Sequence, residues 1–303
     1  MYFINMIPPK HIVISGGGVK VFSFVGALKI LDKNTLLRNV KEYCGVSAGA
    51  WLSFMLAAGV NLAVLEKMIL DMDFGVIRNM TTESLIEFPE TFGFDNGENL
   101  IKLLTSITRV VLKLDPNITF GEFSKVSKCN FRCWATDLNI LSAREFSSKA
   151  TPDVKILDAL RASMSLPLYF TPTLDPVTGN MLTDGGIQGN LPLHMLSDEE
   201  CETALALGFS NGSNELTGNA SPQDLAGFIN SILCTLVQYR NEHITTRWKH
   251  RILRVPVDEY ASWNFEASRD DRQMLLDKGA SASEKWIKCI GSFSRKISRR
   301  HSG

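Results

Sequence analysis

Two short apolar segments near the start of the chain each run into a cluster of glycines, and this pattern limits the folds open to the chain. Residues 11–14 (His-Ile-Val-Ile) are followed by a serine and the three glycines at 16–18. Residues 40–44 are followed by Gly45-Val46-Ser47-Ala48-Gly49. A short β-branched run that ends at glycine predicts a buried strand entering a tight turn. Because an apolar stretch with helical spacing follows each turn, we expect strand–turn–helix units.

The same alternation continues along the chain. Further strands are predicted at residues 131–136, 204–207 and 251–255, and helices at residues 24–31, 157–163 and about 225–239. Residues 62–113 have mostly helical spacing, with breaks near 73–75 and 92–97. Alternating strands and helices are typical of a parallel sheet covered on both faces. The sequence therefore predicts a three-layer α/β/α fold with a mostly parallel central sheet, and residues 62–113 as a helical insert over the functional site.

The last part of the chain differs in composition from the rest. We expect one α/β domain over residues 10–257 and a helical, basic tail over residues 258–303, since 303 residues suffice for one large domain. Two interpretations remain open for residues 285–300: a basic amphipathic helix on an anionic membrane surface, or a solvated terminal helix with a frayed end. Basic and apolar residues alternate there, namely Lys285, Trp286, Ile287, Lys288, Ile290, Phe293, Arg295, Lys296, Ile297, Arg299 and Arg300.

Composition argues against several classes of protein. Lys plus Arg and Asp plus Glu number 32 each, so no net positive field favours nucleic acid as a partner. The six cysteines form no CxxC pair and no signal peptide is recognised, so we expect a cytoplasmic protein with reduced thiols, or one attached peripherally to membranes. The uncharged run from Gly45 to Leu65 is interrupted by glycines and Asn61, which favours two helices over a membrane span.

The segment Gly45-x-Ser47-x-Gly49 fits the turn that presents a nucleophilic serine. In such a turn, a strand passes sharply into a helix, so that the serine hydroxyl is exposed above the sheet. The flanking glycines avoid clashes with neighbouring backbone, and the amino end of the next helix stabilises negative charge. The alternative is that small residues pack at this turn for structural reasons alone.

The glycines at 16–18 are candidates for an oxyanion hole. Glycine backbone lets a reacting carbonyl approach the N–H groups without meeting a Cβ atom. A phosphate-binding loop is the competing interpretation. The spacing fits neither GxGxxG nor GxxxxGK, because Lys20 comes two residues after Gly18 and is followed by Val21.

A serine nucleophile needs a base, and the sequence offers two kinds. A Ser…Asp…His order is available in Ser47, Asp184 and His194, but Ser47 comes too early for the usual triad fold. The other candidate is Asp184 alone, which precedes Gly185 and Gly186. A carboxylate shielded from water can have a pKa high enough for a base, although Asp184 could also simply cap the glycine turn.

Several segments, in order, resemble the patatin-like phospholipases, lipid acyl hydrolases that use a Ser–Asp dyad. The similarity spans roughly residues 10–195. The matching segments are Ser15 to Lys20 with Gly26-Ala27-Leu28, Gly45 to Gly49, Asn117 to Phe120 with Ala135 to Asn139, Ala159 to Pro172 (ALRASMSLPLYFTP), and Asp184-Gly185-Gly186 with Asn190 and Pro192. One departure is Val21, where the family usually has glycine.

The resemblance implies a role for each matching residue. Ser47 is the nucleophile and Asp184 the general base. Gly16, Gly17 and Gly18 form the oxyanion hole, while Gly45, Gly49, Gly185 and Gly186 allow close packing of the two loops. Lys20 has two alternative roles, contact with a lipid phosphate or with a neighbouring carbonyl. The resemblance implies no metal and no cofactor, in agreement with the lack of an EF-hand loop or a His/Cys ligand cluster in the sequence.

The substrate implied is a phospholipid or another glycerolipid, cleaved by a phospholipase A or lysophospholipase type of reaction. Three alternatives remain open: an acyltransferase with the same dyad, a triacylglycerol lipase, and a non-catalytic membrane-binding protein. If the substrate is a lipid, the basic segment 285–300 is the expected contact with the membrane surface.

Overall fold

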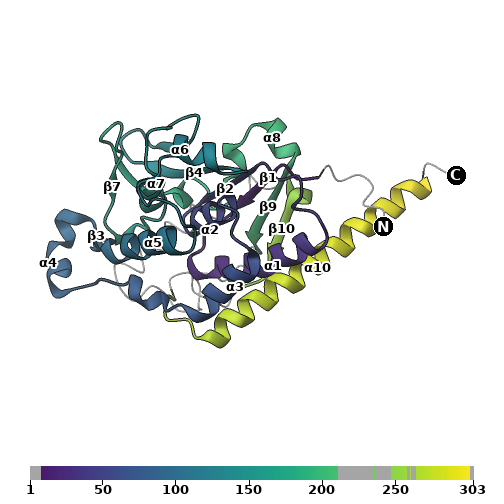
Figure 1. Ribbon diagram of the computed structural model, residues 1–303, viewed down its shortest axis with the longest axis horizontal. Helices are drawn as coiled ribbons and strands as arrows, with labels where there is room; N and C mark the ends of the chain where they lie inside the picture. Colours follow the sequence, from purple (N-terminus) through teal and green to yellow (C-terminus); the bar gives the residue numbers. More distant parts are fainter. Residues whose placement is uncertain (1–7, 211–234, 236–246, 258–259, 261–263, 301–303) are drawn as a thin grey trace.

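The computed structural model describes residues 8–210, 235, 247–257, 260 and 264–300. Its centre is a twisted sheet with helices on both faces (Figure 1). Alternate residues of the strands enter two separate cores: Ile12 and Ile14 belong to the larger one, while Val13 belongs to the smaller one. Burial on both faces explains why the strands are continuously apolar. The predicted mixed α/β fold with a mostly parallel central sheet is confirmed.

The main sheet joins a parallel part to an antiparallel part. In the order β10-β9-β1-β2-β4, neighbouring strands are parallel. β5 and β8 each pair antiparallel with β4, and β7 pairs antiparallel with β8. The strands are β1 (His11–Ile14), β2 (Glu42–Val46), β4 (Asn130–Asp137), β5 (Ser142–Ser147), β7 (Thr173–Leu174), β8 (Met181–Asp184), β9 (Ala204–Phe209) and β10 (Ile252–Val255). β3 (Gly93–Asp95) and β6 (Leu168–Phe170) form a separate parallel pair.

The helices follow the predicted pattern in the described part of the chain. The uncharged run contains two helices, α2 and α3, separated by a break at Gly59 to Asn61. Within the described residues, no helix is both long and apolar enough to cross a membrane. The helix expected near 225–239 lies, apart from Thr235, outside the described residues. The α-helices are α1 (Phe22–Lys33), α2 (Ala48–Ala57), α3 (Leu62–Asp71), α4 (Thr82–Thr91), α5 (Glu98–Val110), α6 (Phe120–Val126), α7 (Ile156–Ser163), α8 (Asp198–Glu202) and α10 (Arg269–Arg300). The 3-10 helices are η1 (Gly18–Val21), η2 (Phe74–Ile77), η3 (Gly185–Ile187), η4 (Pro192–Met195) and η5 (Lys249–Arg251).

The insert at 62–113 is helical with both predicted breaks. The first break contains η2, and the second contains the short strand β3, which the sequence pattern does not reveal. Pairing of β3 with β6 fastens the insert to residues 168–170, which precede β7 and β8 in the chain. α4 projects from the body at the end opposite the far end of α10 (Figure 1), and no residue of α4 is buried.

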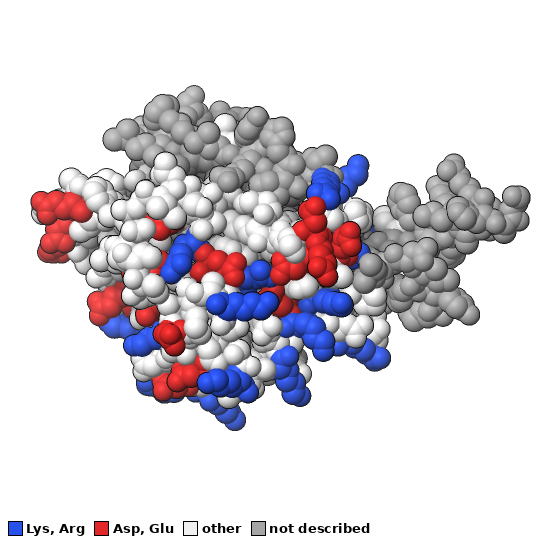
Figure 2. Space-filling view, turned by 90° about the horizontal axis from the view of Figure 1, so that it is seen from above, with Lys and Arg blue, Asp and Glu red and all other residues white. Residues whose placement is uncertain are grey.

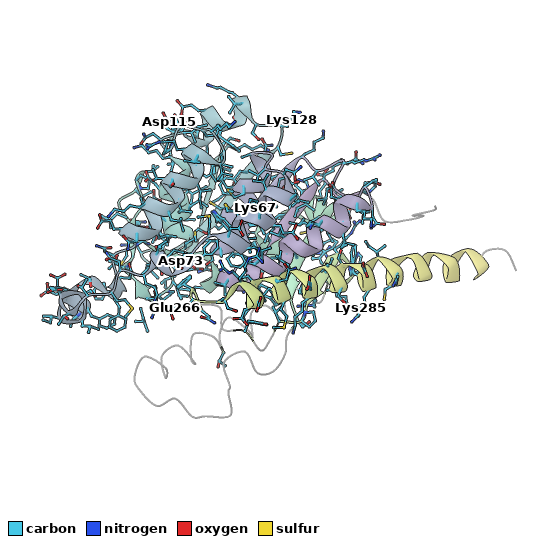
Figure 3. The ribbon with its side chains drawn as sticks, turned by 60° about the horizontal axis from the view of Figure 1, so that its bottom comes forward. Lys67, Asp73, Asp115, Lys128, Glu266 and Lys285 are labelled. Atoms are coloured by element: carbon cyan, nitrogen blue, oxygen red, sulfur yellow. The ribbon has the colours of Figure 1, made fainter. Side chains whose placement is uncertain are left out.

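The predicted C-terminal helix is α10, and its first half belongs to the main core. α10 runs along α1 and beside α3, and its far end extends past the rest of the body (Figures 1 and 3). Leu275 and Leu276 are buried in the larger core. At the crossing with α1, a Cβ atom on Gly279 would overlap the Ser23 carbonyl oxygen, and one on Gly26 would overlap that of Leu276. The two backbones therefore touch, which only glycine permits.

Charged side chains of both signs share the molecular surface. Figure 2 shows Lys and Arg interspersed with Asp and Glu over the face seen from above. This mixture agrees with equal totals of 32 basic and 32 acidic residues in the sequence. The electrostatic features that matter for the site are therefore local ones.

Candidate active site

Ser47 occupies a sharp turn between β2 and α2. Its backbone has a φ of 54° and a ψ of −136°, an unusual conformation for a residue other than glycine. A Cβ atom on Gly45 would lie 2.5 Å from the Gly49 carbonyl carbon, and one on Gly49 would overlap the Ser15 carbonyl oxygen. Gly45 and Gly49 are therefore needed for packing, as predicted by the alternative in which small residues pack at this turn. The same packing leaves the Ser47 side chain partly exposed at the amino end of α2.

The strained turn is held by a residue that the sequence analysis did not single out. Ser163, at the end of α7, accepts a hydrogen bond from the Ser47 N–H at 2.9 Å. The Ser163 hydroxyl in turn donates to the Trp134 carbonyl oxygen at 2.7 Å. Ser163 is fully buried. Its hydroxyl thus fixes the backbone of Ser47 to the neighbouring strand β4.

Ser47 and Asp184 meet on one edge of β4. β2 pairs in parallel with the first part of β4, and its last residue, Val46, lies opposite Trp134. β8 pairs antiparallel with the second part, and its last residue, Asp184, lies opposite Ala135. Because β5 occupies the other edge of β4, β2 and β8 share one edge and meet end to end. Asp184 is thus placed next to the residue that follows β2, which is Ser47.

The environment of Asp184 suits a general base. Its side chain is buried, and burial raises its pKa from 3.8 to about 6, against the opposing effects of the Ser47 hydroxyl and the Gly186 N–H. Oδ1 accepts a hydrogen bond from the Gly186 N–H at 2.7 Å. Oδ2 has no hydrogen-bond partner among the described residues, so the nearby Ser47 hydroxyl does not reach full hydrogen-bond geometry. One carboxylate oxygen is therefore free to accept a proton beside the serine.

The turn after β8, at Asp184 to Gly186, is packed as closely as the turn at Ser47. A Cβ atom on Gly185 would overlap the Trp134 carbonyl oxygen, and one on Gly186 would lie 3.0 Å from Asp184 Oδ1. The Asp184 N–H donates to the Ser165 carbonyl oxygen at 2.9 Å. The end of α7 and the residues just after it therefore hold both candidate residues, Ser47 through Ser163 and Asp184 through Ser165.

The glycine turn after β1 corrects one prediction. The Gly16 N–H donates to the Asn190 carbonyl oxygen at 3.0 Å, so it is not available to an oxyanion. Gly17 and Gly18 have φ angles of 151° and 53°, and within the described residues their N–H groups donate to no protein acceptor. The candidate donors are therefore two glycines rather than three.

Asn190 connects the glycine turn at Gly16 to the segment that follows Asp184. Its Nδ2 donates to the Gly16 carbonyl oxygen at 3.0 Å, while its own carbonyl accepts the Gly16 N–H. Both backbone groups of Gly16 are thus fixed by one residue. Asn190 lies a few residues after Asp184, so the glycine turn and the segment after β8 are joined directly.

Lys20 is not placed to contact a lipid phosphate. Its side chain is only 1% exposed, and its ammonium lies 5.8 Å from the centre of the Phe209 ring. The positive charge is therefore shielded by the protein in this structure. Of the two roles considered for Lys20, its burial favours a contact within the protein.

The histidines provide no alternative base in the described part of the chain. The groups that lower the pKa of Asp184 are the Ser47 hydroxyl and the Gly186 N–H, and no histidine contributes. His194 lies exposed in η4. His11 lies at the amino end of the central strand β1, whereas Ser47 follows the carboxyl end of β2, and burial lowers the pKa of His11.

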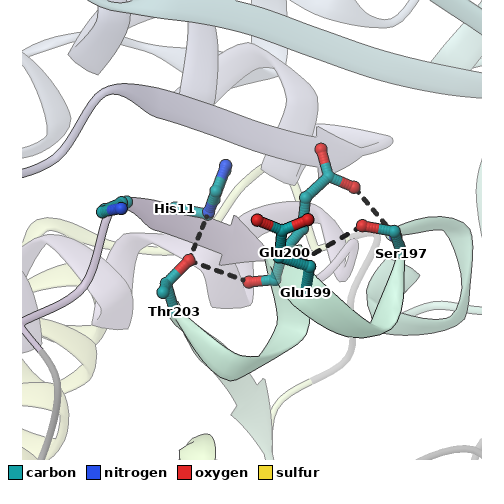
Figure 4. A pocket seen from close by; sticks show the side chains of 6 residues that line it. His11, Ser197, Glu199, Glu200 and Thr203 are labelled. Atoms are coloured by element: carbon teal, nitrogen blue, oxygen red, sulfur yellow. Dashed lines mark hydrogen bonds between the residues drawn. The ribbon is translucent and has the colours of Figure 1, made fainter.

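A polar pocket surrounds His11 at the amino end of β1 (Figure 4). It has a volume of about 410 Å³ and is lined by Lys10, His11, Ser197, Glu199, Glu200 and Thr203. His11, Glu42 and Glu200 bring their ligand atoms within 4.8 Å of one another. Arg132 already bridges the two glutamates, with its Nη2 at 2.5 Å from Glu42 and 2.7 Å from Glu200. Arg132 therefore already pairs with both carboxylates, and we assign no metal to this cluster.

A serine at a strand–helix elbow, a buried aspartate beside it and free glycine N–H groups in an α/β sheet are typical of serine-dependent acyl hydrolases. The family model of the patatin-like phospholipases matches residues 12–197. The chain belongs to this family.

The chain is also similar to individual proteins and to a solved structure. The chain is 28% identical over 289 residues to the uncharacterized protein R571 of Acanthamoeba polyphaga mimivirus, covering 93% of this chain and 95% of that protein. It is 27% identical over 187 residues to the probable lipid hydrolase 463L of Invertebrate iridescent virus 6, covering 61% of this chain and 62% of that protein. The fold is similar to the crystal structure of VipD from Legionella pneumophila, with a TM-score of 0.57, 15% identity, and coverage of 94% and 67% of the two chains.

Proposed function

We propose that this protein is a lipid acyl hydrolase that cleaves glycerolipid esters through an acyl-enzyme on Ser47, with Asp184 as the general base. Membership of the patatin-like phospholipases and the likeness to a probable lipid hydrolase support lipid ester hydrolysis. The observation that carries the dyad is the end-to-end meeting of β2 and β8 on β4, which puts a buried carboxylate with a free oxygen beside Ser47.

In the acylation step, Ser47 Oγ attacks the ester carbonyl and its proton passes to Asp184 Oδ2. The Gly17 and Gly18 N–H groups donate to the oxyanion, and each such donor typically contributes about 3–4 kcal/mol to the transition state. Collapse of the tetrahedral intermediate breaks the ester bond. Protonated Asp184 gives its proton to the leaving alcohol, and the acyl chain stays on Ser47.

In the deacylation step, Asp184 takes a proton from a water molecule, which attacks the acyl carbonyl. The same N–H groups hold the second oxyanion. Asp184 then returns the proton to Ser47 Oγ as the fatty acid leaves. A pKa of about 6 for Asp184 leaves it mostly ionised at neutral pH yet basic enough to accept this proton.

The test is hydrolysis of a fluorescent phosphatidylcholine by the purified protein. We expect Ser47→Ala and Asp184→Asn each to lose at least about a thousandfold in rate. Ser53→Ala is the matched control, because it removes another buried serine hydroxyl, one in the helix after Ser47 that donates to the Cys44 carbonyl oxygen and not to Ser47 or Asp184. Wild-type rates in both dyad variants would exclude the proposed mechanism.

The lipid class and the acceptor are the finer parts of the proposal. We propose a phospholipase A or lysophospholipase reaction, independent of calcium. Mass spectrometry of a lipid panel that includes triacylglycerol measures the preference, and products formed with an added alcohol measure acyl transfer. Vesicle binding without hydrolysis would instead indicate a non-catalytic membrane-binding protein.

We also propose that residues 285–300 contribute to peripheral membrane attachment. The sequence of this segment is strongly basic. Trp286 and Ile287 pack against the larger core, and α10 carries the later part of the segment beyond the body (Figure 3). Basic residues near an anionic membrane contribute about 1 kcal/mol each at low salt. Binding through this segment should therefore require anionic lipid and weaken as salt is added.

A further inference from the structure

Two neighbouring turns beside the dyad carry exposed apolar side chains. One turn follows β4 and the other lies between β7 and β8. We call these five residues the apolar rim: Leu138, 39% exposed; Ile140, 64%; Leu141, 79%; Leu174, 68%; and Val177, 64%. Contiguous exposed apolar groups on a protein surface commonly mark a protein or membrane contact.

Hydrogen bonds join the two turns into one surface. The Leu138 N–H donates to the Met181 carbonyl oxygen at 2.9 Å. The Met181 N–H donates to Asn139 Oδ1 at 2.8 Å. Asn180 Nδ2 donates to Asp137 Oδ2 at 2.9 Å. The apolar side chains are thus presented on a fixed backbone, so the backbone loses little conformational entropy on binding.

The rim stands above the dyad on the same strands that build it. Asp184 lies opposite Ala135 of β4, and β4 continues for two more residues before the turn at Leu138. At about 3.3 Å per residue, Leu138 lies about 10 Å beyond the dyad along the strand. Gln188, just after the dyad loop, contacts the Leu141 carbonyl oxygen at 3.5 Å. The rim therefore lies beyond the carboxyl end of β4, next to the segment that follows Asp184.

The charged groups of these turns are withdrawn from the surface. Asp137 is 1% exposed and accepts from Asn180. Asp175 is 2% exposed and pairs with Arg144, whose Nε lies 2.6 Å from Asp175 Oδ2. The remaining residues of the two turns are apolar or uncharged. The rim thus has no carboxylate that a phosphate would repel and no cation that would attract one.

We propose that the apolar rim docks the protein on a lipid surface with zwitterionic head groups, so that a lipid rising from the surface reaches Ser47 directly. This inference rests on the proposed function, since the substrate would come from that surface. Apolar side chains on a rigid turn enter the boundary between head groups and acyl chains without needing opposite charge. A zwitterionic surface fits an uncharged rim, whereas the basic segment 285–300 fits an anionic one.

The experiment compares a rim variant with a matched control. The rim variant is Leu141→Ser with Leu174→Ser, and the control is Ile86→Ser on α4, where Ile86 is 75% exposed. α4 and β7 lie toward the same end of the molecule (Figure 1). Circular dichroism and thermal unfolding establish that each variant is folded. Binding to phosphatidylcholine vesicles is measured by sedimentation, and hydrolysis is measured on those vesicles and on a soluble monomeric p-nitrophenyl ester.

We expect the rim variant to bind vesicles and to hydrolyse them on the order of tenfold less well, since two apolar side chains that would enter the lipid surface are lost. Its rate on the monomeric ester should stay within about twofold of wild type, and its vesicle binding should not depend on salt. Wild-type vesicle binding by the rim variant, or an equal loss in Ile86→Ser, would overturn the inference. An equal loss on the monomeric ester would also overturn it, because the turns would then support the dyad itself.

The same measurements separate this inference from the proposed function. If wild-type protein hydrolyses neither substrate but its vesicle binding still depends on the rim, the docking surface stands and the catalytic proposal fails. If wild-type protein hydrolyses the ester but does not bind zwitterionic vesicles, the docking inference fails alone. In that case a protein partner becomes the better occupant of the rim.

Discussion

The backbone N–H of Ser47 donates a hydrogen bond to Oγ of Ser163, at 2.9 Å, across 116 residues of sequence. This bond satisfies an N–H group that neither β2 nor α2 pairs, in a residue whose φ is 54°. Since Ser163 also donates to β4, the conformation of Ser47, the proposed nucleophile, depends on where α7 packs.

Ser163→Ala should lower kcat roughly 10- to 100-fold and leave KM nearly unchanged. The variant leaves the Ser47 N–H and the Trp134 carbonyl without a partner, so the elbow can relax. Ser163 is fully buried and does not meet the substrate. Steady-state kinetics on a monomeric ester measure the effect, with Ser53→Ala as the control. An unchanged kcat would show that the elbow holds its shape without Ser163.

Asp184→Asn should stabilise the protein at pH 8 but not at pH 3. Burial raises the pKa of Asp184 to about 6 from 3.8, so folding disfavours its ionised form. The penalty is absent below about pH 4, grows as pH rises to about 6 and is complete above that. The two pKa values correspond to about 3 kcal/mol at 1.36 kcal/mol per pH unit. Urea unfolding of both proteins at several pH values tests this, and a constant difference would contradict it.

Arg161→Met should destabilise the protein by about 3 kcal/mol and lower kcat. Burial lowers the pKa of Arg161 to about 10. Its guanidinium donates to Ser165 Oγ at 2.6 Å and to the Asn96 and Thr171 carbonyl oxygens at 3.0 Å each. Thus Arg161 links the insert to the residue that accepts the Asp184 N–H.

Urea unfolding and steady-state kinetics measure the two effects of Arg161→Met. Arg161→Lys is the informative companion, because it keeps the charge but loses the forked donor geometry. Wild-type stability in both variants would show that the insert is fastened by β3 and β6 alone.

Gly279→Ala should lower stability by about 2 kcal/mol, although alanine favours helix. The added methyl group would overlap the Ser23 carbonyl oxygen, so α10 must move away from α1. Ser281→Ala is the control, because Ser281 is exposed on the same helix. Thermal unfolding measures both, and equal melting temperatures would show that α10 is not an integral part of the domain.

The sequence was sufficient to predict the α/β class and the family, and it singled out Ser47 and Asp184, which the structure places side by side. The motifs around Ser47 and Asp184 are short, local and rich in glycine, so they are visible in the chain. Their meeting could not be predicted, because it depends on β8 pairing in line with β2. β7 has two residues and β8 has four, too few to show a period, and they form through pairing to β4 and to each other.

The surroundings of Gly16 and Lys20 depend on tertiary packing. The sequence offered Gly16 as an oxyanion donor and left two roles open for Lys20, whereas the residues that contact them, Asn190 and Phe209, come from distant segments. Ser163 was overlooked for the same reason, since one serine in ALRASMS has no distinguishing mark. A local pattern predicts which backbone conformation is available, whereas the hydrogen-bond partners depend on the tertiary packing.

The most direct test of the dyad is the pH dependence of Ser47 labelling by a fluorophosphonate, with the adduct located by peptide mass spectrometry. The reaction needs ionised Asp184, so the rate should rise through a pKa of about 6 and level off above it. Asp184→Asn should remove both the rise and nearly all of the labelling. Labelling at another serine, or wild-type labelling in Asp184→Asn, would contradict the proposed Ser47–Asp184 dyad.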